Sequence, residues 1–437
     1  MTTNVCIIGA GPSGIAAAKT LHQNNIPFDC YERGSGIGGN WRYNNDNGLS
    51  SAYRSLHINT NRLVMAYSDF PMPADYPMFP HHSQIIRYFD HYVDQFGFRD
   101  KITFKTSVEE VTHNPGPTGE LPTYHVRTDT GLERDYTHLI VANGHHWNPR
   151  YPDPPFPGQF AGEIIHSHDY KVPDQIMGKD LLVVGIGNSA VDIACEAARL
   201  HTGRVTISTR SGAYIMPNWL MGRPFDSLAS PGMAKLPMRV QRFMLNLSLR
   251  MAWGDQNRYG VPKPDRPLLS EHPTVSQDLL NMAGRGLIRF KPNIERFDGH
   301  DVLFTDGSRD SFDMVIYATG YKVTFPFFKQ GFFNVEQSND LQLYRRVVHP
   351  DFPNLYFLGL VQPLGAIMPL AETQSVWIAK LINGTCRLPD RDAMLRSIAE
   401  EADRNRRRYK QSARHTLQVD FYPYKQSLER EMKIMRA

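Results

Sequence analysis

The chain has 437 residues, of which 41% are hydrophobic and 21% are charged, and its formal net charge is +4. This composition is typical of folded proteins rather than disordered ones, and so small a net charge argues against a nucleic-acid partner. At roughly 150 residues per domain, the length predicts two to three domains.

Three absences in the sequence bear on the location of the protein and on its metal and disulfide chemistry. There is no run of 18 apolar residues that could form a membrane-spanning helix, and the short apolar stretch at 5–8 lacks the basic segment of a secretory signal. The four cysteines form no CxxC pair, which argues against a disulfide framework or a zinc site. We therefore expect a cytoplasmic protein with no stable membrane anchor.

The first chemical motif is a glycine-rich turn between an apolar run and a helical pattern. Residues 4–14 read NVCIIGAGPSG, and residues 13–23 are alanine-rich. Glycines in a GxGxxG pattern allow a tight turn, close approach of a pyrophosphate and helix–strand packing, and the helix N-terminus faces the phosphates. We predict a dinucleotide site built from Gly9, Gly11, Pro12, Ser13 and Gly14.

An acidic residue follows the next apolar run, at 28–31. Glu32 lies 18 residues after Gly14, where a carboxylate accepts hydrogen bonds from ribose hydroxyls. The alternative is a glycine-rich turn that binds nothing. The strand, the helix and the acid in register favour the dinucleotide site.

Two hairpins are predicted further along the chain. Short β-type segments flank the turn dipeptides Thr130-Gly131 and Asp306-Gly307, at 124–136 and 302–312.

A second glycine turn repeats the first. Residues 181–190 read LLVVGIGNSA, with glycines at Gly185 and Gly187 and with Ala190 as an accepted variant of the third glycine. Helical residues and a strand at 205–208 follow. We expect Asn188 and Ser189 to take part in this second dinucleotide site.

The second strand does not end in an acid. It is followed by Thr209-Arg210, and no carboxylate stands where Glu32 stood in the first copy. A guanidinium suits the 2′-phosphate of NADPH by charge and by bidentate geometry, although a surface arginine is the plain alternative. Two dinucleotide sites predict hydride transfer between NADPH and a second cofactor, most simply FAD.

These motifs predict an α/β fold with two Rossmann-like dinucleotide-binding domains, the NADPH domain being inserted into the FAD domain. Buried-type strands at 139–142 and 314–317 each run into a glycine and are interpreted as crossings between the domains. We expect the FAD domain at 1–170 and 305–437. The NADPH domain is expected at 171–304, with a helical insert around 225–270.

Two further helices are predicted. Polar residues recur at helical spacing through 238–253 with apolar residues between them, so we expect an amphipathic helix packed on the core of the protein. A lid over the substrate or a membrane-surface contact are the alternatives. At 404–410 the basic run follows Glu400 and Asp403, and i,i+4 pairs with Arg404 and Arg407 predict a solvated helix face.

Several motifs together resemble the flavin-containing monooxygenases. Phe160, Gly162, His166 and Tyr170 fit that family's FxGxxxHxxx[YF] signature, in a segment where the related Baeyer–Villiger enzymes have Trp-Pro and this chain has Tyr170 and Lys171. The family's remaining motifs are matched by three segments: Glu32 with Gly38, Gly39 and Trp41, the ATGY at 318–321, and the stretch 359–369 that is similar to eukaryotic-type members. The resemblance covers nearly the whole chain. The hydrophobic C-terminal anchor of the mammalian members is missing from this sequence.

The resemblance implies an enzyme of the N,N-dimethylaniline monooxygenase type. It would use NADPH, O2 and FAD to oxygenate soft nucleophilic nitrogen or sulfur centres through a flavin hydroperoxide. Asn59 matches the asparagine that faces the reactive edge of the flavin, although a turn or helix cap is the plain alternative for this residue. The resemblance also implies cofactor contacts from Gly39, Asn40, Trp41 and Gln362.

Other functions and sites stay open at this point. Baeyer–Villiger oxygenation of ketones and a non-catalytic nucleotide-binding redox protein are the alternatives. The pairs His81-His82 and His145-His146 lack a nearby cysteine or carboxylate cluster, so no metal site is predicted. The expected partners are a small nucleophilic substrate, O2 and a second copy of the chain in a homodimer.

Overall fold

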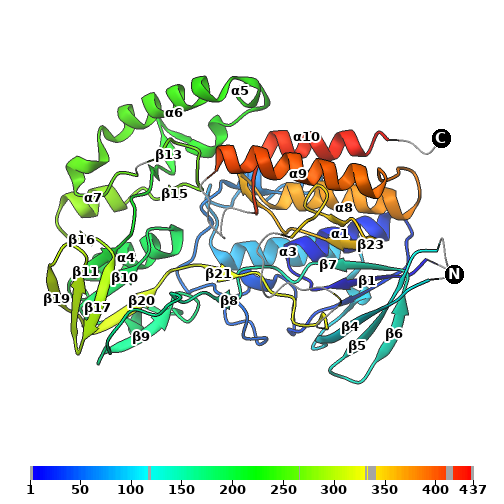
Figure 1. Cartoon of the computed structure of the whole chain (residues 1–437), viewed down its shortest axis with the longest axis horizontal. Coiled ribbons are helices and arrows are strands. Elements are labelled where there is room, and N and C mark those ends of the chain that lie inside the picture. Colours follow the sequence, from blue (N-terminus) through cyan, green and yellow to red (C-terminus); the bar gives the residue numbers. More distant parts are fainter. Residues whose placement is uncertain are drawn as a thin grey trace. The chain divides into compact units, whose positions relative to one another are not determined.

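The structure is a computed structural model that describes residues 3–116, 120–264, 266–329, 332, 341–409 and 417–434. The chain divides into two compact units (Figure 1). Unit 1 comprises 1–52, 56–148 and 322–437, and unit 2 comprises 53–55 and 149–321. Across the described ranges, no helix has both the length and the apolar character needed to span a membrane.

Unit 1 is built on a six-stranded sheet in the order β22-β23-β7-β1-β2-β3. The strands of this sheet are β1 (Val5–Ile8), β2 (Phe28–Tyr31), β3 (Ile102–Thr103), β7 (His138–Val141), β22 (Val348–His349) and β23 (Phe352–Phe357). The helices of the unit are α1 (Pro12–Gln23), α2 (Arg62–Met65), α3 (His82–Phe96), α8 (Met368–Ile382), α9 (Arg391–Arg408) and α10 (Phe421–Glu431). Its remaining strands are β4 (Val108–Asn114), β5 (Thr123–Thr128), β6 (Glu133–Tyr136), β24 (Gln362–Leu364) and β25 (Gln418–Asp420).

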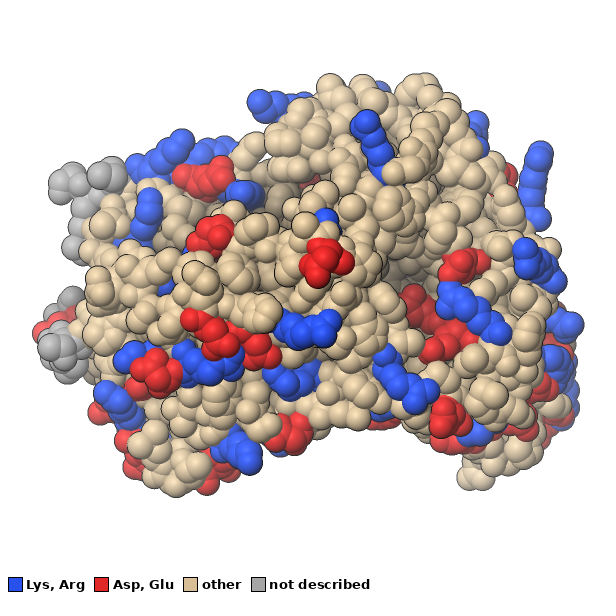
Figure 2. Space-filling view, turned by 180° about the vertical axis from the view of Figure 1, so that it is seen from behind, with Lys and Arg blue, Asp and Glu red and all other residues tan. Residues whose placement is uncertain are grey.

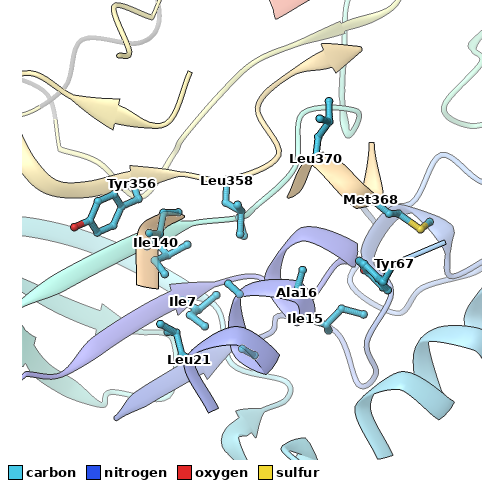
Figure 3. Packing of buried hydrophobic residues seen from close by; sticks show 14 of the residues in the cluster. Ile7, Ile15, Ala16, Leu21, Tyr67, Ile140, Tyr356, Leu358, Met368 and Leu370 are labelled. Atoms are coloured by element: carbon cyan, nitrogen blue, oxygen red, sulfur yellow. The ribbon is translucent and has the colours of Figure 1, made fainter. Parts of the chain in front are cut away.

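The two faces of this sheet bury different partners because successive strand residues point to opposite sides. Ile7 and Ile140 lie on the face that packs against helices α1 and α8 (Figure 3). Cys6 and Leu139 lie on the other face, in a cluster with residues of the antiparallel sheet β4-β5-β6. Both faces are therefore covered, which explains why the strands are nearly continuous apolar runs.

Unit 2 is built on a five-stranded parallel sheet in the order β16-β11-β10-β20-β9. The strands of this sheet are β9 (Glu163–His166), β10 (Leu181–Val184), β11 (Val205–Ser208), β16 (Ile288–Lys291) and β20 (Met314–Tyr317). The helices are α4 (Asn188–Leu200), α5 (Pro231–Lys235), α6 (Met238–Trp253) and α7 (Leu279–Gly284). The other strands are β12 (Ile215–Met216), β13 (Trp219–Leu220), β14 (Arg223–Pro224), β15 (Thr274–Val275), β17 (Ile294–Asp298), β18 (Asp301–Phe304) and β19 (Arg309–Ser311). Strands β8 (Asn148–Pro149) and β21 (Tyr321–Lys322) lie where the chain passes between the units.

The two units repeat one plan. In unit 1 the spatial order of the strands is β7-β1-β2-β3. Helix α1 follows β1 in the chain, and the sheet β4-β5-β6 is inserted before β7. In unit 2 the order β20-β10-β11-β16 carries α4 in the same place, with β17-β18-β19 inserted before β20. The predicted α/β fold with two Rossmann-like domains is confirmed, and both predicted hairpins form, as β5–β6 and β18–β19.

The chain changes units at 148/149 and 321/322 rather than at 170/171 and 304/305 as expected. The reason lies in strand pairing. Strand β9 pairs in parallel with β20, which pairs in parallel with β10, so the strands on both sides of the expected boundaries belong to one sheet.

Helix α6 forms at the predicted residues, but the expectation that it packs on the core is wrong for most of its apolar residues. Leu249 is buried, whereas Phe243, Leu247 and Met251 are 68%, 48% and 57% exposed. The guanidinium of Arg242 points inward instead, donating hydrogen bonds to the Leu268 carbonyl at 2.8 Å and to Ser270 Oγ at 3.1 Å. The surface over α5 and α6, at the top of Figure 2, is largely uncharged, with some lysines and arginines and few acids.

Helix α9 presents the solvated, charged face that was predicted, with one change of partner. Glu400 pairs with Arg404 at 3.7 Å, as expected. Asp403 pairs with Arg406, at i,i+3, instead of with Arg407.

Candidate functional site

The two glycine loops have the same backbone geometry. In the first, the Gly9 N–H donates to the Tyr31 carbonyl at 2.8 Å, and in the second the Gly185 N–H donates to the Ser208 carbonyl at 2.9 Å. Gly9 and Gly185 have φ angles of +99° and +124°, which side chains other than glycine rarely adopt. Each loop therefore places the N-terminus of a helix at the carboxyl ends of the parallel strands.

Space is also tight at these glycines. A Cβ atom on Gly9 would lie 2.8 Å from the Ala142 carbonyl oxygen, and one on Gly185 would lie 2.6 Å from that of Ala318. A Cβ on Gly14 would lie 1.9 Å from the Gly9 carbonyl oxygen. The glycines at these positions are thus required by the fold of the turn itself.

Gly11 is different, because it leaves the loop open. A Cβ there would meet only the Cα of Gly39, at 3.8 Å. Gly11 and Gly187 are the N-cap residues of helices α1 and α4, and neither helix has a side-chain cap. Uncapped N–H groups at a helix N-terminus are the donors that a pyrophosphate accepts from, so both loops fit a bound dinucleotide.

Glu32 lies beside the first loop and holds it. Its carboxylate accepts hydrogen bonds from the N–H groups of Ala10 and Gly34, each at 2.8 Å. Burial raises the pKa of this carboxyl, against the lowering effect of those two hydrogen bonds. Oε1 also accepts from the Asn47 side chain at 3.4 Å, whereas Oε2 accepts only from Ala10 among the hydrogen bonds of the described residues and keeps a lone pair for a ribose hydroxyl.

The repeat shows which residues correspond in the two loops. Because Tyr31 and Ser208 accept the same hydrogen bond, Glu32 corresponds to Thr209 and Arg33 corresponds to Arg210. Both arginines are exposed. An arginine is therefore common to both loops, and the difference between them is the carboxylate of the first, which Thr209 replaces in the second.

The segment 38–41 lies against the first loop. A Cβ on Gly39 would come within 3.1 Å of the Gly11 Cα, and Gly38 has a φ of +110°. Asn40 Oδ1 accepts hydrogen bonds from the N–H and hydroxyl of Ser51, at 2.7 and 2.8 Å. Trp41 packs on the main core of unit 1. This segment therefore borders the first loop, with the Gly38 N–H donating to the Ala10 carbonyl at 3.0 Å.

Gln362 lies in the stretch that follows β23. The Gly359 backbone approaches the first loop so closely that a Cβ on it would lie 2.1 Å from Ser13 Oγ. Gln362 is half-buried in strand β24. Gly359 therefore borders the glycine loop of unit 1, three residues before Gln362, whose cofactor contact stays a prediction.

Asn59 and Asn61 differ in what their side chains do. Asn61 is fully buried, and its side chain accepts from the N–H groups of Leu63 and Val64 at the start of α2. Asn61 is thus the helix cap in this segment. Asn59 is exposed, so its carboxamide can meet a ligand.

In the second loop, Asn188 is held and Ser189 is exposed. Asn188 Oδ1 accepts from the Val275 N–H at 2.8 Å. The Thr274 hydroxyl donates to the Ile186 carbonyl at 2.6 Å. Strand β15 therefore holds the loop in place, and no sequence motif pointed to this role.

The signature segment 160–170 is structural. Gly162 leaves no room for a side chain, because a Cβ would lie 2.3 Å from the Asp313 carbonyl oxygen. His166 is fully buried, and burial lowers its pKa to about 4. The Tyr170 hydroxyl donates to Glu196 at 2.6 Å. Within the described ranges, no group of three or more His, Cys, Asp or Glu side chains could hold a metal ion.

Comparison with known proteins places this geometry in context. The model of the flavin-binding monooxygenase-like family matches residues 2–435. The chain is similar to flavin-containing monooxygenase 5 of Oryctolagus cuniculus, with 37% identity over 95% of this chain and 80% of that protein. It is 33% identical to dimethylaniline monooxygenase [N-oxide-forming] 2 of Rattus norvegicus, over 99% of this chain and 83% of that protein.

Among solved structures, the fold is similar to that of the S-allyl-L-cysteine S-oxygenase from Allium sativum. The TM-score is 0.72, with 24% identity over 100% of this chain and 90% of that one. An NADP-bound steroid monooxygenase has a TM-score of 0.70 and 17% identity, over 98% of this chain and 97% of that one.

Proposed function

Since the chain belongs to the flavin-binding monooxygenase-like family, we propose that it oxygenates soft nitrogen or sulfur atoms of small molecules. It is a flavin-containing monooxygenase that uses FAD and NADPH. One oxygen atom of O2 goes to the substrate. The other leaves as water, with two electrons from NADPH and a proton.

The assignment of the two cofactors is supported by the repeated glycine loop, whose two copies differ in having Glu32 in the first and Thr209 in the second. Unit 1 would hold FAD, with Glu32 on a ribose and with Gly39, Asn40, Trp41 and Gln362 around the first loop. Unit 2 would hold NADPH on the second loop. Thr209 leaves room there for the 2′-phosphate that a carboxylate at this position would repel, and Arg210 supplies the positive charge.

Bound FAD supplies the redox chemistry, by accepting a hydride from NADPH and passing electrons to O2. The protein contributes binding, orientation and exclusion of water. Asn59 offers a neutral carboxamide that can hydrogen-bond a cofactor without adding a charge. Since the oxidising power belongs to the cofactor, a nucleophilic substrate needs no general base from the chain.

The preference for nitrogen or sulfur over ketones is supported by the name of a relative that is 33% identical, an N-oxide-forming monooxygenase. The fold is also similar to that of a cyclohexanone monooxygenase, at 16% identity, so the fold alone does not separate these chemistries. The segment after His166 carries Tyr170-Lys171 where Baeyer–Villiger enzymes carry Trp-Pro.

The test is a substrate panel of a tertiary amine, a thioether and a cyclic ketone, with NADPH, O2 and mass spectrometry of the products. We expect N-oxide and sulfoxide with substrate-dependent NADPH consumption. Lactone as the main product would establish the Baeyer–Villiger alternative. If no substrate increases NADPH consumption and no oxygenated product forms, the protein is a non-catalytic redox protein.

The homodimer and the cytoplasmic location stay predictions. Light scattering of the purified protein tests the first, and cell fractionation tests the second.

A further inference from the structure

Residues 359–362, which follow β23, border the proposed FAD site and begin in a loop. Their conformation therefore depends on contacts with other parts of the chain. Strand β23 lies beside β7, which lies beside β1, and all three run in parallel, so their carboxyl ends share one edge of the sheet. Ligands of such sheets bind at this edge. Gly359 lies two residues after β23, has a φ of +73°, and approaches Ser13.

A buried amide holds Gly359. Gln374, on helix α8, is fully buried, and its Oε1 accepts from the Gly359 N–H at 2.9 Å. Its Nε2 donates to the hydroxyl of Tyr424 at 2.7 Å. If the amide were reversed, an N–H donor would face the Gly359 N–H. The acceptor provided by Tyr424 therefore fixes which end of the amide faces the loop.

Tyr424 lies on α10 and is itself held. Its hydroxyl donates to the Arg345 carbonyl at 2.7 Å. Arg345 and Arg346 have φ angles of +51° and +58°, a conformation that non-glycine residues hold only where their surroundings keep them there. Three hydrogen bonds thus connect the loop at Gly359 to a second, conformationally restricted loop through helices α8 and α10.

The same C-terminal part of the chain supports the stretch at a second place. Strand β25 pairs in parallel with β24, with Gln418 opposite Gln362. A Cβ on Gly365 would lie 3.0 Å from that of Phe421, so α10 begins directly against the loop. Strand β25 and the start of α10 therefore contact this part of the chain at Gln362 and at Gly365, and Gln374 of α8 holds it at Gly359.

From these contacts we propose that Gln374 and Tyr424 are positioning residues for FAD, which hold the 359–362 stretch in the conformation that completes the cofactor site. The inference rests on the proposed function, since it requires unit 1 to bind FAD. Each acts through the backbone of Gly359.

The test is FAD retention by the holoenzyme. Tyr424→Phe removes one hydroxyl, which leaves the Gln374 amide free to turn and the Arg345 carbonyl without its donor. We expect the Kd for FAD to rise about tenfold, measured by flavin fluorescence on dilution and on reconstitution. Gln374→Asn keeps the amide but shortens its reach, so it should raise the Kd similarly. It serves as the second variant if Tyr424→Phe does not fold.

A matched control is Tyr344, another buried tyrosine whose hydroxyl binds a residue of helix α10. This hydroxyl donates to Glu431 at 2.7 Å, whereas that of Tyr424 accepts from Gln374. Tyr344→Phe should lower the midpoint of thermal unfolding by an amount similar to Tyr424→Phe and leave the Kd for FAD within about twofold of the parent.

The outcomes separate the two proposals. A raised Kd in Tyr424→Phe and Gln374→Asn, but not in Tyr344→Phe, supports the positioning role. An equal rise in all three, or in none, overturns it, because the effect would then be general loosening or no effect. If the unmutated chain binds no FAD at all, the proposed function fails, and this inference fails with it.

Discussion

Tyr53 and Asp192 form a hydrogen bond of 2.6 Å although they are 139 residues apart in the sequence. Tyr53 precedes Asn59 by six residues, yet residues 53–55 belong to unit 2, and Asp192 lies in the helix that starts the proposed NADPH site. The ring of Tyr53 also lies 5.8 Å from that of Tyr170. A short piece of the N-terminal chain is therefore an integral part of unit 2.

This pair predicts a pH-dependent contribution to stability. Burial raises the pKa of Asp192 from 3.8 to about 6, against the lowering effect of the Tyr53 hydrogen bond. Between these two pH values the unfolded chain has lost this proton and the folded chain still holds it. The contribution of Asp192 to the unfolding free energy therefore falls as pH rises from about 4 to 6 and stays low above 6.

Asp192→Asn keeps an acceptor for Tyr53 and removes this fall in stability. Relative to the parent, it should gain about 1–2 kcal/mol in unfolding free energy between pH 4 and pH 7, measured by urea titration. Parallel curves for the two proteins would contradict this assignment.

Arg210 is expected to set the preference for NADPH over NADH. Loss of a charge-assisted contact with the 2′-phosphate in Arg210→Ala should cost about 1.5–3 kcal/mol, or roughly ten- to a hundredfold in kcat/KM for NADPH, with little change for NADH. The control is Arg33→Ala, at the corresponding position of the first loop, which should leave the NADPH/NADH ratio unchanged. Equal use of both nucleotides by the parent would show that Arg210 points elsewhere.

Gly9 is expected to be needed both for the fold and for FAD. In Gly9→Ala the alanine backbone would have to adopt a φ of +99°, and its Cβ would lie 2.8 Å from the Ala142 carbonyl oxygen. We expect a loss of about 2–4 kcal/mol in stability and a protein that purifies without yellow colour. Gly131→Ala is the matched control, since Gly131 has a φ of +80° but open space around it. It should cost only about 1 kcal/mol and keep its flavin spectrum.

Asn59 and its neighbour Asn61 should separate function from stability. Asn61→Ala removes the cap of α2 and should destabilise the protein by about 1 kcal/mol. Asn59→Ala should leave stability and FAD content unchanged but raise the share of NADPH electrons that are released as hydrogen peroxide. Asn59→Asp should be worse than Ala, because it adds a negative charge where negative charge develops. Peroxide release and product yield per NADPH are the measurements. Equal coupling in both Asn59 variants and the parent would remove Asn59 from the site.

The apolar residues on α6 should differ in their effect on stability according to their exposure. Phe243 is 68% exposed and Leu249 is 8% exposed. Phe243→Ser should change the unfolding free energy by less than about 0.5 kcal/mol and lower the binding of a hydrophobic dye, whereas Leu249→Ser should cost about 2–4 kcal/mol. Denaturant titration of the two variants checks this. A large loss in Phe243→Ser would mean that this face is buried in the protein in solution.

The two βαβ openings and their glycine loops were predictable from the amino-acid sequence alone. This was possible because the information is local: Gly9 and Gly185 need φ angles that only glycine adopts easily, Gly14 has no room for a side chain, and each buried strand is a short apolar run. Glu32 follows its strand directly, so its place beside the loop is a consequence of chain order. Even the assignment of the two hairpins depended only on turn dipeptides and their flanking segments.

The contacts between segments distant in the sequence were not predictable and are known from the three-dimensional structure alone. The periodicity of α6 separates polar from apolar residues but does not show which side of the helix faces the protein. The apolar side, which was expected to be buried, is largely exposed. Corresponding residues of the two loops, Glu32 with Thr209 and Arg33 with Arg210, became clear from shared hydrogen bonds. The contacts Tyr53–Asp192 and Gln374–Tyr424 join residues whose spacing in the chain carries no pattern, since a single hydrogen bond between remote side chains leaves no periodic trace in the sequence.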